Sequence, residues 1–382
     1  MRNDCRNIAD KLKNIGGQLE SMTVTVGFDG FVDEITRVVK NRVDADNYAV
    51  FETITEFSVN IRNAAGKSAD MEIIREDIKL GGNAPIMANA LASLGVNTTC
   101  IGAMGYPSFN QVFGQMAPKC KNMSICDPGY TYAFEYNDGK LMFANLKPLE
   151  DLTWDRVKEF IGLDRIIDIF RSCDLIALVN WSIAYNVGTI WQGIREEVLP
   201  HMRDSGYPMP KVFFDLADPS KRLKKDIQDV LQLIGEYSEF CDVTLGLNKN
   251  EAERVYKALN NGDGCSCEIE SGFDNGIFIE DICIGIYQNL SIDTLLVHPV
   301  DCCIAVNKNG IRKRTGRVVE SPKLTTGGGD NFNAGYCLGQ LLGFDVEDSM
   351  IIGMATSATY VQNGYSPSMD ELISYLDCME KI

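Results

Sequence analysis

Short apolar runs of strand length alternate with helical patterns along most of this chain, and this alternation restricts the fold more than any other feature. The helical pattern is clearest in GGNAPIMANALASLG (81–95), where Ile86, Ala90 and Leu94 share one face and a final glycine is placed to end the helix. Strands that alternate with helices predict an α/β fold with a mostly parallel sheet covered on both faces. In such sheets ligands bind beyond the carboxyl ends of the strands. The predicted strands cover 22–31, 97–105, 173–181, 210–219, 241–248, 293–300 and 302–307.

Two regions interrupt the alternation and predict a second, smaller sheet. The runs EITRVVKNRV and MEIIREDIKL, within 34–80, are rich in β-branched residues and lack helix caps. The run YTYAFEYNDGKLMFANL (130–146) predicts a hairpin that turns at its N-D-G sequence. We expect these two regions to form a small β-sheet lid inserted into one α/β domain that spans 1–382. Long edge insertions without a role are the alternative.

The charge of the chain restricts its partners. With 36 basic and 53 acidic residues the net charge is −17, so an anionic ligand needs a local device such as a helix N-terminus or a metal ion. A nucleic-acid partner is not expected, because the longest basic cluster, IRKRTGR (311–317), is short and fits a solvated hairpin face. No apolar run is long enough for a membrane span, and the N-terminus predicts an amphipathic helix and not a signal peptide. We therefore expect a cytoplasmic protein.

The thirteen cysteines do not indicate a disulfide framework or a zinc site. Many lie in apolar runs, where a free thiol behaves as a small hydrophobic residue. The pairs Cys265/Cys267 and Cys302/Cys303 lack C-x-x-C spacing, and only two histidines are present. We expect reduced thiols and no metal cluster.

Three glycines precede an acid at the start of a predicted helix in TTGGGDNFNAGY (325–336). Glycines before a helix let the backbone approach a ligand and aim unpaired N–H groups at it, where the helix dipole favours negative charge. Asp330 would repel a resting anion, so its position is useful if it accepts a proton from a hydroxyl while the N–H groups hold a transferring phosphoryl group. A glycine turn with an acid as helix cap is the alternative.

Two further motifs begin predicted helices. Gly81, Gly82 and Asn83 open the early helix after an extended segment, where the backbone can approach a small ligand. Asn248 and Glu251 follow the strand CDVTLGL, so an amide and a carboxylate lie at the carboxyl end of a strand. They could orient the water shell of Mg²⁺, or they could simply cap the helix.

The order of these motifs resembles that of the ribokinase-like (PfkB) carbohydrate kinase family, and the resemblance covers most of the chain. The late motif resembles D-T-x-G-A-G-D of that family, with Leu324 in place of the first acid. The resemblance implies a three-layer α/β sandwich with a β lid, Asp330 as catalytic base, and an anion hole. The anion hole would be formed by Gly327, Gly328 and Gly329.

The same resemblance implies the ligands and their contacts. Mg²⁺ would be held mainly by nucleotide phosphates and water, near Asn248 and Glu251. The nucleotide would also contact Thr325, Thr326 and Asn333. The acceptor sugar would lie near Gly81, Gly82 and Asn83, and its binding aspartate falls on Asp33, with Asp29 as second choice.

Departures from the family pattern leave the donor and the monovalent cation open. The acid that Leu324 replaces helps to bind a monovalent cation in some members, which puts potassium activation in doubt. The sequence V-H-P around His298 resembles the ADP-dependent branch, so ATP is favoured as donor and ADP stays open. His298 is either a nucleotide contact or a structural histidine.

The predicted function is a kinase that transfers a phosphoryl group from a nucleotide, with Mg²⁺, to a hydroxymethyl group of a sugar. A nucleoside kinase and a non-catalytic sensor are the alternatives, and a dehydrogenase is disfavoured because no G-x-G-x-x-G follows the first strand. A phosphorylated acceptor would need basic groups, for which Arg37, Lys40 and Arg75 on the lid are candidates. A homodimer through the lid edge and a monomer both stay open.

Overall fold

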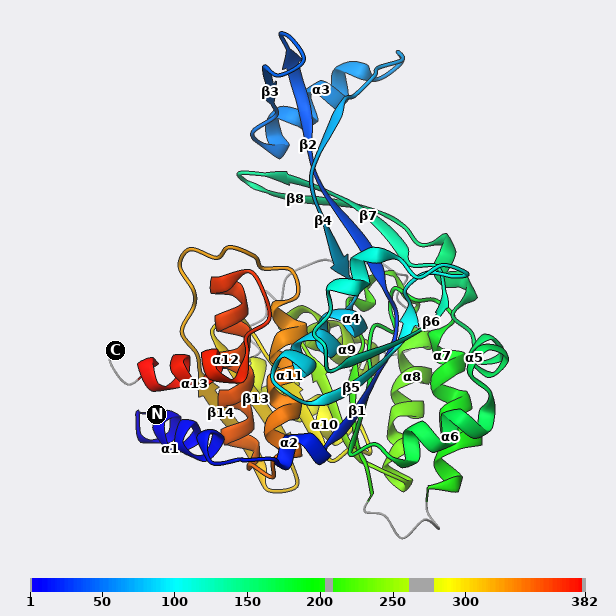
Figure 1. Cartoon of the computed structure of the whole chain (residues 1–382), viewed down its shortest axis with the longest axis vertical. Helices are drawn as coiled ribbons and strands as arrows, with labels where there is room; N and C mark the ends of the chain where they lie inside the picture. The colour runs from blue at the N-terminus through cyan, green and yellow to red at the C-terminus, as the bar shows by residue number, and fades with distance from the viewer. Residues whose placement is uncertain (1, 203–208, 261–277, 380–382) are drawn as a thin grey trace.

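The computed structural model describes residues 2–202, 209–260 and 278–379, and its centre is a nine-stranded sheet in the order β14-β13-β12-β11-β10-β9-β1-β5-β6 (Figure 1). Neighbouring strands from β6 to β12 are parallel, and β13 and β14 are antiparallel additions at one edge. The predicted mostly parallel sheet is therefore confirmed. The strands are β1 (Thr23–Phe28), β5 (Asn97–Ala103), β6 (Cys120–Cys126), β9 (Leu175–Leu178), β10 (Lys211–Asp215), β11 (Asp242–Leu247), β12 (Thr294–Val297), β13 (Cys302–Asn307) and β14 (Gly310–Thr315).

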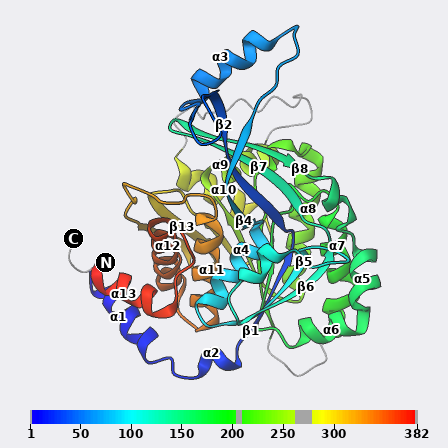
Figure 2. The same cartoon turned by 45° about the horizontal axis from the view of Figure 1, so that its top comes forward.

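Helices cover both faces of this sheet, which makes the three layers (Figure 1, Figure 2). Strand alternation divides the core in two: Val212 and Phe214 of β10 face one hydrophobic cluster, and Phe213 faces the other. The first cluster packs under α5 (Trp154–Ile161), α6 (Leu163–Arg171), α7 (Val187–Gly193), α8 (Lys224–Glu236), α9 (Lys249–Asn260) and α10 (Ile279–Gln288). The second packs under α1 (Arg2–Lys13), α4 (Asn83–Ser93), α11 (Gly328–Leu341), α12 (Val346–Asn363) and α13 (Met369–Cys378).

A five-stranded sheet projects from the core as a separate arm (Figure 1). Its order is β3-β2-β7-β8, with β4 paired to β2, and it carries the segments predicted as the lid. A helix, α3 (Ile54–Ala64), was not expected there; its N-terminus is capped by Thr53, whose side chain accepts from the Glu56 N–H. The lid strands are β2 (Phe31–Arg42), β3 (Tyr48–Val50), β4 (Ile73–Gly81), β7 (Gly129–Tyr136) and β8 (Gly139–Asn145).

The predicted strand over 22–31 is wrong in one respect, because the chain changes sheets within it. β1 ends at Phe28 in the core, and β2 begins at Phe31 in the lid. Asp29 and Gly30 form the link, and a side chain at Gly30 would lie 2.0 Å from the carbonyl oxygen of Ala103. Only a glycine fits there, so the crossing point is set by close backbone contact.

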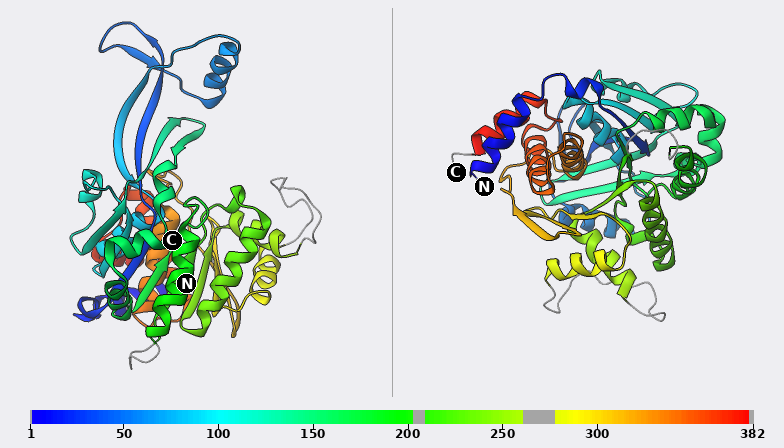
Figure 3. Two further views of the ribbon diagram at one scale, coloured as in Figure 1. Left: turned by 90° about the vertical axis from the view of Figure 1, so that its right-hand side faces the viewer. Right: turned by 90° about the horizontal axis from the view of Figure 1, so that it is seen from below.

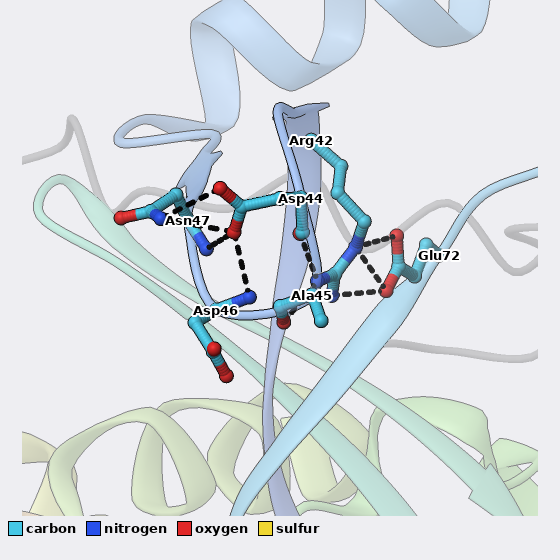
Figure 4. Close-up of polar contacts among 6 residues, drawn as sticks. All are labelled: Arg42, Asp44, Ala45, Asp46, Asn47 and Glu72. Carbon is cyan, nitrogen blue, oxygen red and sulfur yellow. Dashed lines mark hydrogen bonds and ion pairs between the residues drawn. The ribbon is translucent and has the colours of Figure 1, made fainter.

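The far end of the lid is held by its own charged groups (Figure 4). The Arg42 guanidinium donates to both carboxylate oxygens of Glu72 and to the carbonyl oxygens of Asp44 and Ala45. The Asp44 carboxylate accepts from the N–H groups of the next turn and from the Asn47 side chain. These contacts join the end of β2 to the residue that precedes β4, and they close the turn that leads to β3.

The two ends of the described chain lie side by side (Figure 3). α1 packs beside α13, and Lys13 pairs with Asp377 at 2.9 Å. In 2–202, 209–260 and 278–379, none of the helices has the length and apolarity needed to cross a bilayer.

Cysteines in the described ranges are free, Cys302 and Cys303 among them, and no metal-binding group of three or more side chains is found there. Cys265 and Cys267 lie outside the described residues. The basic cluster of β14 is engaged in ion pairs: Arg312 and Arg314 each contact Glu347.

Candidate active site

The glycine motif forms the start of α11, at the edge of the sheet where the parallel strands end. Gly327 is the N-cap residue with φ of 90°, and a side chain there would lie 2.6 Å from the Tyr360 hydroxyl. Asp330 is in the first turn of the helix and is only 9% exposed. The structure thus places a buried carboxyl beside the unpaired N–H groups of a 14-residue helix.

Four acids gather at this point from four different elements. Asp29 follows β1, Asp215 ends β10, Glu251 lies in the first turn of α9, and Asp330 lies in α11; all are buried. Burial raises the pKa of Asp330 well above its ordinary value; Asp215, Asp29 and Glu251 raise it further, and a hydrogen bond from Asn83 opposes them. In the described part of the chain no ion pair is formed by any of these acids. Negative charge is concentrated here without a compensating cation.

Asparagine side chains hold two of these acids. Asn333 donates to Asp215 at 2.7 Å, and it is fully buried. Asn180, which follows β9, donates to Asp29 at 2.5 Å. The sequence analysis predicted Asn333 as a nucleotide contact, whereas the structure places its side chain against Asp215. We propose that Asn333 positions the Asp215 carboxyl. Asn180 was missed, because the predicted strand over 173–181 included it, whereas β9 ends at Leu178.

Asn248 and Glu251 bind each other. The Asn248 backbone N–H and side-chain amide donate to the two Glu251 carboxylate oxygens at 2.9 and 2.5 Å, and the Glu251 N–H donates back to Asn248 at 3.0 Å. This is a reciprocal cap at the start of α9. Burial, followed by the charge of Asp215, raises the pKa of Glu251 to about 8.

The two early glycines make room for two carboxylates. The Asp29 carboxylate accepts from the N–H groups of Asn83 and Ala84 at 2.9 and 2.7 Å, so it caps α4. A side chain at Gly82, whose φ is 93°, would lie 2.9 Å from Asp29, and one at Gly81 would lie 2.3 Å from Asp33. Asp29 is thus engaged by the backbone of α4 and by the Asn180 side chain.

Asp33 lies on the lid strand β2, where burial raises its pKa and a hydrogen bond from Thr131 opposes the rise. Burial raises the pKa of Tyr360, and the charges of Asp330 and Asp33 raise it further, so the lid acid lies on the same side of the molecule as the glycine loop. Of the two candidates for acceptor binding, Asp33 and Asp29, Asp33 has the carboxylate with fewer hydrogen bonds to the protein.

A cavity of about 520 Å³ adjoins the glycine loop. Thr325, Gly328, Gly329 and Asn248 line one end of it, and Cys5 lies in its wall. Apolar side chains form most of the remainder: Val300, Val318, Val319, Pro322, Phe332, Ile351, Met354, Ala355, Ala358 and Val361. Such a cavity suits a flat, largely apolar group joined to an anion at the helix N-terminus.

Two predicted nucleotide contacts differ in their placement. Thr325 lines the cavity, whereas the Thr326 carbonyl oxygen accepts from Tyr360. His298 also lines the cavity; its ring stacks on Phe332 at 4.6 Å between centroids, and burial lowers its pKa to about 4. Its Nε2 atom is buried and has no hydrogen-bond partner in the described residues, which leaves it available to a ligand in the cavity.

Comparison of the chain with known proteins identifies its family. The profile described as prokaryotic ketohexokinase matches residues 3–379. The chain belongs to the prokaryotic ketohexokinase family. A ketohexokinase of Haloferax volcanii is 26% identical over 358 residues, which cover 92% of this chain and 90% of that protein.

Solved structures show the ribokinase-like fold at low sequence identity. Arabidopsis thaliana ribokinase, complexed with ribose and ATP, is 14% identical, with a TM-score of 0.61 and coverage of 93% of this chain and 98% of that one. An Escherichia coli protein assigned as ribokinase II, in complex with ATP and Mg²⁺, is 13% identical, with a TM-score of 0.61 and coverage of 94% and 99%.

The predicted family, fold class and enzyme class are therefore confirmed. This member of the prokaryotic ketohexokinase family is a carbohydrate kinase, a phosphotransferase with an alcohol group as acceptor. The alternatives of a nucleoside kinase, a sensor and a dehydrogenase are set aside. The roles of single residues stay predictions.

Proposed function

We propose that this protein transfers the terminal phosphoryl group of a nucleotide, ATP in preference to ADP, to a hydroxymethyl group of a ketohexose, with Asp330 as general base. The observation that carries the proposal is the buried Asp330 carboxyl in the first turn of α11, directly after three glycines. The family match and the Haloferax volcanii ketohexokinase support the acceptor class.

The environment of Asp330 suits a base that acts near neutral pH. A carboxyl of ordinary pKa is a weak base toward an alcohol, and burial beside other acids makes Asp330 a stronger one. A cation that arrives with the donor would return it to the ionised form. The Asp330 carboxylate then takes the hydroxyl proton as the hydroxyl oxygen bonds to phosphorus, and the nucleotide leaves with the electrons of the broken P–O bond.

The N–H groups of the glycine loop would stabilise the transferring group. Gly327 and Gly329 leave their N–H groups without a partner in the described residues, at the N-terminus of a long helix, whereas Gly328 is buried and its N–H donates to the Thr325 carbonyl at 3.1 Å. Donors fixed in advance act mainly on charge that develops in the transition state, so they raise kcat more than they lower KM.

Asn248 and Glu251 would contact Mg²⁺ through water molecules. Every oxygen of the Asn248–Glu251 cap already accepts a hydrogen bond, so this pair would orient water around the ion and leave direct coordination to the nucleotide phosphates. The uncompensated acids Asp215, Glu251 and Asp330 would be stabilised by such a cation. When bound, Mg²⁺ supplies charge neutralisation of the phosphates.

The lid supports a neutral acceptor. The three basic residues considered for a sugar phosphate are each paired with a glutamate: Arg37 with Glu76 at 3.5 Å, Lys40 with Glu56 at 2.5 Å and Arg75 with Glu34 at 3.9 Å. A phosphate would have to displace these partners. We therefore propose an unphosphorylated ketohexose, bound by Asp33 and the Gly81–Asn83 turn.

The lid also exposes apolar side chains that support the homodimer alternative. Tyr132, Met142 and Phe143 are 40, 47 and 55% exposed on β7 and β8. Burial of this surface against a second lid would remove it from water. Sedimentation of the wild type and of Phe143→Asp tests this: a dimer that becomes a monomer supports the proposal, and a monomer in both rejects it.

The test of the proposed function is phosphoryl transfer with Mg²⁺ and either ATP or ADP to a ketohexose or a ketohexose phosphate. We expect turnover with ATP and the neutral sugar, and a kcat lower by about 10²–10⁴-fold in Asp330→Asn. Asp345→Asn is the matched control, because Asp345 only caps α12. Wild-type kcat in Asp330→Asn would reject the assignment of the base, and a preference for ADP or for the sugar phosphate would reject that part of the proposal.

A further inference from the structure

Two hydroxyl groups of α12 contact the carbonyl oxygens of the glycine loop. The Tyr360 hydroxyl donates to the Thr326 carbonyl at 2.7 Å, and the Ser357 hydroxyl donates to the Gly328 carbonyl at 2.8 Å. The two side chains are three residues apart and so lie on one face of the helix. Neither position was singled out by the sequence.

These two bonds fix the direction of two peptide planes. In a trans peptide the C=O of one residue and the N–H of the next point in opposite directions. Because the carbonyls of Thr326 and Gly328 point toward α12, the N–H groups of Gly327 and Gly329 point away from it. In the described residues neither N–H has a partner, and both belong to the end of the helix that favours anions.

The backbone of α12 holds the approach to the loop as well. The N–H groups of Lys323 and Leu324 both donate to the Val361 carbonyl, at 3.0 and 3.4 Å. The absence of a side chain at Gly327 lets the Tyr360 hydroxyl approach. The loop is therefore held along its length by the last two turns of one helix.

We propose that Tyr360 and Ser357 are positioning residues for phosphoryl transfer: they hold the loop so that the N–H groups of Gly327 and Gly329 face the transferring group. This inference rests on the proposed function, because it assigns what keeps the anion hole in its working geometry. Preorganised donors need no reorientation as charge develops. Loss of either hydroxyl frees one peptide to rotate and so weakens transition-state binding more than substrate binding.

The test is the kinetics of Tyr360→Phe and Ser357→Ala, which each remove one hydroxyl and keep the rest of the helix surface. We expect kcat to fall about 10-fold in each, with the KM values for sugar and nucleotide within about twofold of wild type. Ser357→Thr restores a hydroxyl and should recover most of the loss. Thr359→Val is the matched control, because within the described ranges the Thr359 hydroxyl bonds only to the Ala355 carbonyl of its own helix.

A second measurement separates positioning from stability. Binding of the product nucleotide with aluminium fluoride and sugar, as a mimic of the transferring group, should weaken about 10-fold in Tyr360→Phe and Ser357→Ala, whereas binding of nucleotide alone should not change. A purely structural role would lower the melting temperature and leave this ratio at its wild-type value.

Asp330→Asn is measured beside these variants, so that two kinds of failure can be told apart. If Asp330→Asn is inactive while Tyr360→Phe and Ser357→Ala keep wild-type kcat and wild-type binding of the mimic, the positioning role is overturned and the proposed function stands. If Asp330→Asn keeps wild-type kcat, the assignment of the base is overturned, and Tyr360→Phe and Ser357→Ala decide the positioning role by themselves. Should Tyr360→Phe unfold, Ser357→Ala carries the same test.

Discussion

Acidic side chains are treated in opposite ways in the core site and in the lid. Around the glycine loop, burial raises the pKa values of Asp215, Glu251 and Asp330. At the far end of the lid, hydrogen bonds from their partners lower the pKa values of Glu56 and Glu72. These lid acids are paired with basic side chains of the lid itself, and the pairs hold its segments together. The core site leaves negative charge to be compensated by something that binds.

Asp33 is the exception that joins the two regions. It is a lid residue, yet burial raises its pKa as it does for the core acids, and its carboxylate lies against Gly81. The comparison therefore predicts that buried acids with raised pKa values serve the reaction, whether they lie in the core or in the lid. Four predictions test it, from the largest expected effect to the smallest.

Substitution of Gly327 by alanine should have the largest effect. The left-handed φ of 90° and the 2.6 Å approach to the Tyr360 hydroxyl both exclude a side chain, so Gly327→Ala should displace the loop and lower kcat by about 10²-fold. Gly343→Ala is the control, because Gly343 has a φ of 75° but open space around it. Equal kcat values in the two variants would mean that backbone strain alone, and not the place of Gly327 in the site, lowers kcat.

Removal of the Asp33 charge should come next. Asp33→Asn is expected to raise the KM for the ketohexose about 10-fold or more while the KM for nucleotide stays within about twofold, because the site loses an acceptor for sugar hydroxyls. Asp77→Asn on the neighbouring strand β4 is the control, since Asp77 is exposed. A rise in both KM values, or in neither, would remove Asp33 from the acceptor site.

Stability without Mg²⁺ should depend on pH through Glu251. Its pKa in the folded protein, about 8, is above the ordinary 4.5, so the folded state binds the proton more tightly than the unfolded chain does. The free energy of unfolding therefore falls as the pH rises between these two values. We expect the melting temperature to drop by roughly 2–4 °C from pH 6 to pH 8.5.

Glu251→Gln should reduce that drop, since an amide does not titrate. Asp29 and Asp330 have raised pKa values as well and contribute in the same direction, so part of the dependence should persist. Thermal unfolding at several pH values measures both proteins. A drop of equal size in Glu251→Gln would exclude Glu251 as a source.

The smallest effect is expected at the far end of the lid. Arg42→Ala removes the contacts to Glu72 and to the turn shown in Figure 4, all of them near the surface. Exposed ion pairs contribute about 0–1 kcal/mol, so the melting temperature and kcat/KM should change little, with kcat/KM within about twofold. A tenfold loss of kcat/KM would show that the lid charges serve the reaction, and the contrast with the core would fail.

Much of the fold could be predicted because its signals are local. Strand alternation and helical periodicity located the core strands, and the N-D-G turn located the hairpin of β7 and β8. β6 was missed, and so was α3, whose single cap residue Thr53 is a weak signal beside a β-branched run. The change of sheet at Asp29 was invisible because it depends on the carbonyl of Ala103, far along the chain.

The sequence by itself determined the kind of chemistry: three glycines before Asp330, an Asn–Glu pair after a strand, and two glycines before a helix. These motifs can be recognised from the sequence because each consists of residues that are neighbours along the chain. Only the tertiary structure decided that Asp33 stays freer while Asp29 caps α4, and that Tyr360 orients the loop from 34 residues away. Those contacts follow from how helices and strands pack, which no local pattern records.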